Sequence, residues 1–221
     1  FIQEILNEFG GMLNDGKEMF ESSTQKLLRG EAPENLGEKI YQTDRGINML
    51  ERDIRKRILI HLAAAPTVKF PVCLILMSVA KDAERLGDYA KNLYEIGGIL
   101  DSTEEDIRKF GELFSKIHDD IIEQFDRTRV AFFESNENEA RQVGKIGVDV
   151  RKTCDRLIHD IANGDYTTRQ AVAYALSARH FKRISCHLSN IASAVTLPLD
   201  YLDFTGTYVK ETFEMNLNDS D

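Results

Sequence analysis

Two carboxylate side chains in the first half of the sequence have the spacing of neighbouring ligands on one helix face. Glu84 and Asp88 lie four residues apart in the run 84–92, E-R-L-G-D-Y-A-K-N. At about 100° per residue they lie about 40° apart around an α-helix, on the side opposite to Leu86 and Leu93. We therefore expect both carboxylates to lie outside the core, on a solvent-accessible face.

A second strip of oxygen-bearing side chains occurs upstream, where Asp44, Asn48 and Glu51 share one face of another predicted helix. We expect Asp44 to form an exposed acidic face together with Glu84 and Asp88. If the two helices run antiparallel as neighbours, four or five oxygen ligands converge, a set that suits Mg²⁺, Mn²⁺ or iron. The spacing alone is also explained by a solvated face whose acids pair with Lys81 and Lys91, because such surface ion pairs are common.

Six long segments with helical apolar spacing would position these residues, and short polar breaks separate them. Gly30 ends the first segment, and Pro66 and Pro71 interrupt the chain after the second. Ser102 followed by Glu105 predicts a capping box at the start of the fourth. No segment alternates with period two, so we expect no sheet. The predicted helices span about 3–29, 34–63, 71–98, 103–134, 136–163 and 167–196.

The second half of the sequence repeats the first. Residues 84–93 of the third predicted helix align with 182–191 of the sixth, and 47–54 of the second align with 154–161 of the fifth. Three helices followed by three related helices predict an all-α, duplicated antiparallel three-helix bundle with rods about 40 Å long. The expected organisation is a first repeat over 1–100, a second over 101–197, and a mobile acidic tail over 198–221.

Composition narrows the classes of function. The net charge of −9 argues against a nucleic-acid partner, which would require a basic surface. The three cysteines are far apart, and the first residues lack the basic and apolar regions of a secretory signal, so we expect a cytoplasmic protein. The most apolar run, 70–80, is shorter than the roughly 20 residues of a membrane span, so we expect no direct membrane insertion.

The two acidic motifs together resemble those of a known family. The run E-R-L-G-D-Y-A-K-N is similar to the E-R-[IL]-G-D-x-A-x-N signature of PhoU proteins. The upstream run D-R-G-I-N-M-L-E, residues 44–51, resembles the acidic signature on the second helix of that family. The two motifs occur in the family's order and separation, and the resemblance covers about residues 5–196. It implies the same duplicated three-helix bundle that the internal repeat predicts.

The resemblance also implies a function. PhoU proteins damp phosphate uptake and phosphate-starvation signalling without catalysis, through contacts with a phosphate transporter or a sensor histidine kinase. Some carry metal clusters on the faces that bear these motifs. The resemblance thus implies a metal ion or cluster, iron or zinc with Mg or Mn also compatible, at Asp44, Asn48, Glu84 and Asp88. The oligomeric state stays open, a homodimer included.

The second repeat departs from the family pattern. Lys182 and Cys186 occupy the positions of Glu84 and Asp88, and Arg151 that of Asp44. Cationic side chains repel a metal, so we expect metal in the first repeat only. Two alternatives stay open. One is a cytoplasmic PhoU-like domain of a sodium/phosphate symporter. The other is a carboxylate-bridged metal enzyme, for which the sequence offers no histidine ligands and no evident nucleophile or base.

Overall fold

The structure is a computed structural model of the 221-residue chain, and it describes residues 1–64, 70–101 and 103–202. Its helices are α1 (Ile2–Arg29), α2 (Leu36–Ala64), α3 (Phe70–Ile96), α4 (Glu104–Phe133), α5 (Glu137–Asn163), α6 (Thr168–Thr196) and the short 3-10 helix η1 (Leu199–Tyr201). The described residues contain no strand. The all-α prediction is confirmed, and each predicted α-helix ends within two residues of its observed bounds.

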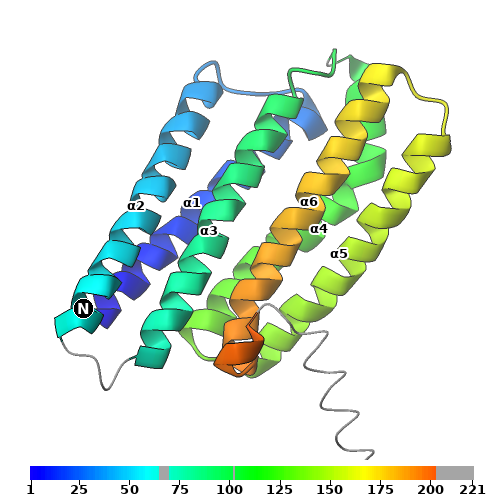
Figure 1. Cartoon of the computed structure of the whole chain (residues 1–221). Helices are drawn as coiled ribbons and strands as arrows, with labels where there is room; N and C mark the ends of the chain where they lie inside the picture. Colours follow the sequence, from blue (N-terminus) through cyan, green and yellow to red (C-terminus); the bar gives the residue numbers. More distant parts are fainter. Residues whose placement is uncertain (65–69, 102, 203–221) are drawn as a thin grey trace, which may run out of the picture.

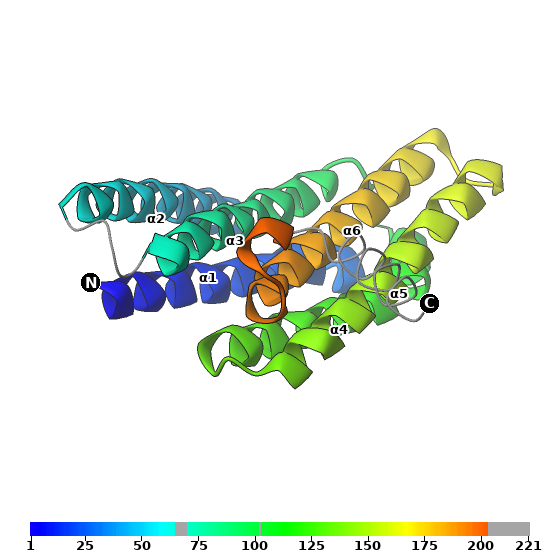
Figure 2. The same ribbon diagram turned by 60° about the horizontal axis from the view of Figure 1, so that its bottom comes forward.

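The six helices form two antiparallel three-helix bundles that pack side by side (Figure 1). Helices α1, α2 and α3 make the first bundle, and α4, α5 and α6 make the second. The two bundles meet where α3 packs on α6 and where α1 packs on α4, which leaves α2 and α5 at opposite outer edges (Figures 1 and 2). No helix in the described part of the chain combines the length and hydropathy that a membrane crossing needs.

Local capping explains where the helices begin and end. Gly30 adopts a left-handed conformation, with φ of 70°, and its N–H donates to the Lys26 carbonyl at the end of α1. The predicted capping box of α4 is shifted by one residue. Thr103 caps the helix and Asp106 completes the box, whereas Ser102 lies outside the described residues. Pro71 does not interrupt a helix. It lies in the first turn of α3, where a backbone N–H would have no acceptor within the helix, so the missing N–H costs no hydrogen bond.

The hydrophobic core runs through both bundles without a break, and its buried side chains come from all six helices. An aromatic cluster connects the repeats at its centre. The ring of Phe20 on α1 lies 5.9 Å from that of Phe125 on α4 and 5.5 Å from that of Phe181 on α6, edge to face in the second case. Phe181 also stacks on Phe114 at 5.3 Å. The two repeats are therefore bound together by aromatic packing and not only by their connection between α3 and α4.

Candidate functional site

Helices α2 and α3 lie side by side, and small residues on α3 permit the close approach. Ala80, Ala83 and Ala90 are buried, and so is Gly87. A Cβ atom on Gly87 would lie 3.0 Å from Cδ1 of Ile47, so a larger residue there would push the two helices apart. This spacing brings the acidic strips of the two helices face to face.

The two strips meet at a lysine. The Lys91 ammonium donates to Oδ2 of Asp44 on α2 at 2.8 Å and to Oδ1 of Asp88 on α3 at 3.2 Å. Asn48 also donates its amide N–H to Oδ2 of Asp44, at 3.4 Å. Lys91 therefore serves as the counter-ion for carboxylates on both helices and holds the two strips together.

Two further acids complete this group, which we call the acidic cluster: Asp44, Glu51, Glu84 and Asp88. Arg85 pairs with Asp88 at 2.8 Å and with Glu84 at 3.4 Å, and Glu51 pairs with Arg55 at 3.1 Å. The four predicted site residues, Asp44, Asn48, Glu84 and Asp88, are thus brought to one seam between α2 and α3.

Crowding among the acids raises the proton affinity of Glu84. Burial raises the pKa of Glu84, and the negative charges of Asp88, Glu51 and Asp44 raise it further, although Arg85 opposes them. Burial alone would lower the pKa of Lys91, but its hydrogen bonds to Asp44 and Asp88 raise the pKa on balance. The lysine consequently stays charged at neutral pH, while Glu84 takes up a proton at a higher pH than an ordinary glutamate does.

The prediction of an open, solvent-exposed acidic face is wrong for Asp44. This residue is buried, with only 7% of its surface exposed, and the side chains of Glu84 and Asp88 keep only 14% and 24% exposure. Helical spacing identified the face that carries the acids. It did not show that the neighbouring helix covers that face, which turns a surface strip into a partly desolvated seam.

The donor atoms of the cluster suit a hard cation, but their present arrangement holds an ammonium group. Asp44 and Asp88 direct oxygens at Lys91, and Arg85 pairs with both Glu84 and Asp88. Among the described residues, no group of three or more histidine, cysteine, aspartate or glutamate side chains is arranged to hold a metal ion. These acids could coordinate a metal ion only if the Lys91 ammonium moved away from Asp44 and Asp88. The metal site therefore stays a prediction.

The equivalent position in the second repeat contains a single ion pair. Lys182, at the position of Glu84, donates to both carboxylate oxygens of Asp155 at 2.5 and 2.7 Å. Burial raises the pKa of the neighbouring Cys154 thiol to about 12, so this sulfur is protonated at neutral pH. The expectation that any metal would bind only in the first repeat stays a prediction.

Sequence reasoning missed a buried polar contact at the α3–α6 seam. Asp82 accepts hydrogen bonds from Nδ1 of His187 at 2.7 Å and from Nδ2 of Asn190 at 3.3 Å, and the Tyr89 ring stacks on His187. A signal for it exists in the sequence. Asp82 shares the apolar stripe of its helix with residues such as Val79 and Leu86, and a buried acid at such a position needs a partner.

Comparison with known proteins decides the family. The family model described as the PhoU domain matches residues 9–97 and 114–195, which is most of the chain. The chain belongs to the PhoU family. A search of curated proteins finds no match.

Two solved PhoU structures share the fold. The phosphate transport system regulatory protein PhoU from Streptococcus pneumoniae superposes with a TM-score of 0.76 at 19% identity, covering 92% of this chain and 95% of that one. PhoU from Pseudomonas aeruginosa gives a TM-score of 0.73 at 17% identity, covering 90% and 95%. The PhoU family's all-helical architecture is therefore present over nearly the whole described chain.

Proposed function

We propose that this PhoU-family chain is a non-enzymatic cytoplasmic regulator of phosphate uptake and phosphate-starvation signalling. It acts through contacts with a phosphate transporter or a sensor histidine kinase. The observation that carries this proposal is the match of the PhoU model across both repeats. The shared fold with a protein described as a phosphate transport system regulator supports it.

The acidic cluster and the charged residues around it are the surface that we propose for these contacts. Arg85 lies beside the cluster with its side chain 45% exposed, and Lys81 and Glu95 are exposed on neighbouring turns of α3. A partner that offers complementary charges can exchange ion pairs with this edge without unfolding either helix. Such exposed contacts weaken as salt rises, because charges are screened beyond about 10 Å at 0.1 M ionic strength.

A pull-down from detergent-solubilised membranes tests the regulatory role. We expect the wild-type protein to recover a phosphate transporter or sensor kinase at low salt and to recover less at high salt. The double variant Glu84→Ala, Asp88→Ala should recover less of it at low salt. The matched control Asp119→Ala, Glu123→Ala removes two exposed acids four residues apart on α4 and should behave like wild type. Failure to recover any transporter or kinase would contradict the proposed function, and equal recovery by both variants would exclude this surface.

We further propose the acidic cluster as the place of a metal ion or cluster, with Asp44, Glu84 and Asp88 as oxygen donors and Asn48 beside them. Protein purified without chelators should retain metal by elemental analysis. The Glu84→Ala, Asp88→Ala variant should lose it, whereas Lys91→Ala should retain more because the competing ammonium is gone. Metal content that is the same in all three proteins would refute the assignment, as would its absence from wild type.

A further inference from the structure

One end of the first repeat exposes an unusual number of large apolar side chains. Leu59 and Ile60 in the last turns of α2, and Phe70 and Val72 in the first turn of α3, are each between 43% and 59% exposed. We call these four residues the apolar tip. The tip lies at the end of the molecule where α1 begins and α6 ends (Figure 1). Large apolar side chains exposed together at one end of a molecule are candidates for a binding surface.

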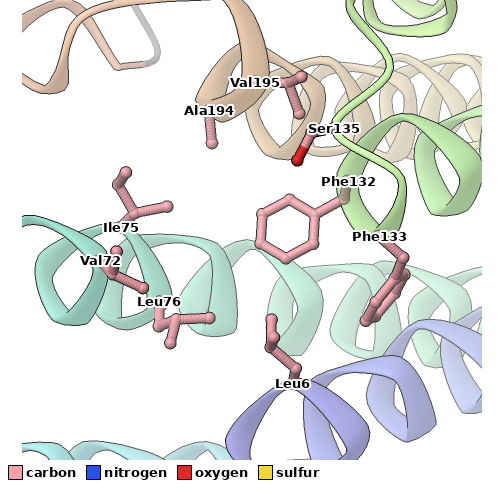
Figure 3. Close-up of a pocket in the computed structure, with 9 residues that line it drawn as sticks. All are labelled: Leu6, Val72, Ile75, Leu76, Phe132, Phe133, Ser135, Ala194 and Val195. Atoms are coloured by element: carbon pink, nitrogen blue, oxygen red, sulfur yellow. The ribbon is translucent and has the colours of Figure 1, made fainter. Parts of the chain in front are cut away.

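The apolar character continues into a groove between the two repeats. Val72 and Leu76 of α3, Leu6 of α1, Phe132 and Phe133 of α4 and Val195 of α6 line this groove, whose volume is about 320 Å³ (Figure 3). The polar lining side chain there is Ser135. No charged residue occurs in α3 before Lys81, so the start of this helix has an uncharged surface. The tip is therefore one side of a broader apolar end and not an isolated set of side chains.

Basic residues precede the tip along α2. The segment from Arg52 to Ala64 contains four basic residues and one acidic residue, although the chain as a whole carries a net charge of −9. Arg55 and Arg57 are engaged by acidic neighbours. Arg52 and Lys56 are exposed, and no described residue forms an ion pair with either.

The spacing of these groups fits a bilayer surface. Arg52, Lys56 and Ile60 follow one another at intervals of four residues and so share a stripe of α2. Lys56 lies about 6 Å along the helix axis from Ile60 at about 1.5 Å per residue. A lysine at that distance from an inserted side chain can reach the lipid phosphates, because its long apolar stem lets the ammonium group extend toward the headgroups.

We propose that this end of the molecule binds the interfacial region of an anionic lipid bilayer. Leu59, Ile60, Phe70 and Val72 enter the apolar boundary, while Arg52 and Lys56 contact anionic headgroups. The net charge of −9 disfavours attraction of the chain as a whole to such lipid, but the acids near the tip, Glu4, Glu8 and Asp53, are engaged by Arg57. Screening over about 10 Å at 0.1 M ionic strength makes the local charge of the tip the relevant one. The binding requires no membrane-spanning segment, because the inserted side chains are those of Leu59 and Ile60 near the end of α2 and of Phe70 and Val72 at the start of α3.

Co-sedimentation of the full chain with lipid vesicles tests this inference. We expect wild type to bind vesicles that contain phosphatidylglycerol and to bind pure phosphatidylcholine vesicles far more weakly. Arg52→Gln, Lys56→Gln should reduce affinity for the anionic vesicles about 25-fold, at roughly fivefold for each basic residue. Leu59→Ser, Ile60→Ser should reduce it at least as much, because the inserted apolar area is lost.

The matched control is Val172→Ser, Leu176→Ser, which removes two exposed apolar side chains at the opposite end of the molecule, near the start of α6. Its vesicle binding should equal that of wild type, and circular dichroism should show the same helix content in every variant. Absence of wild-type binding, or an equal loss in the control, would overturn the proposal. A concentration-dependent dimer abolished by Leu59→Ser, Ile60→Ser, without vesicle binding, would assign the tip to a second copy of the chain instead.

Discussion

Replacement of Phe20 with alanine is expected to lower the free energy of unfolding by about 4 kcal/mol, as for other fully buried phenylalanines. Phe20 is completely buried and belongs to the first repeat, yet its ring contacts Phe125 and Phe181 of the second. The loss should therefore appear in urea unfolding as one transition shifted to lower denaturant and not as two separate transitions. Far-UV circular dichroism and tyrosine fluorescence should give the same midpoint.

The matched control is Phe70→Ala, which deletes the same ring from an exposed position of the first turn of α3. Its cost should stay below about 1 kcal/mol, because the ring is about half solvated in the folded protein. If Phe20→Ala instead left a second repeat that unfolded at the wild-type midpoint, the repeats would be independent domains. The conclusion that one core spans both bundles would then be wrong.

The second large effect is expected at the α3–α6 seam. Asp82→Ala should cost about 3 kcal/mol, because it leaves the partly buried donors of His187 and Asn190 without their shared acceptor. Chemical denaturation at neutral pH measures this cost. Asp53→Ala, which removes an exposed acid paired with Arg57 four residues away, should cost at most about 0.5 kcal/mol.

A double-mutant cycle separates the pair from the cavity that each truncation leaves. When Asp82→Ala and His187→Ala are combined, the total should fall short of the sum of the single effects by about 1 kcal/mol or more. Additive effects would show that the 2.7 Å contact contributes nothing beyond packing.

Much of the fold could be predicted from the sequence because the signals are local. Gly30 and Pro33 stop one helix, and the 3.6-residue apolar period fixes which face of each helix is buried. The internal repeat then pairs the helices into two bundles. The shift of the α4 cap from Ser102 to Thr103 shows the limit of this approach, since two adjacent hydroxyl residues offer the same signal.

The candidate site could be predicted only in part. The spacing of Glu84 and Asp88 placed them on one face, and the antiparallel neighbour supplied Asp44 as expected. The burial of Asp44 depends on how closely α2 approaches α3, which is a tertiary property set by Gly87 and Ile47. Which partner a charged residue selects is equally non-local. Lys91 could have faced solvent, and only the packed helices show that it lies between two carboxylates.

The contrast between the seams of the two repeats has a consequence for recognition. The two bundles follow the same order of helices, so a partner that recognised only that arrangement could bind either bundle. One bundle presents a cluster of four acids, two of which share Lys91, whereas the equivalent position of the other presents one lysine–aspartate pair. A partner that recognises the charges can therefore bind in one orientation. The divergence of the repeats thus makes two surfaces of similar backbone arrangement chemically different.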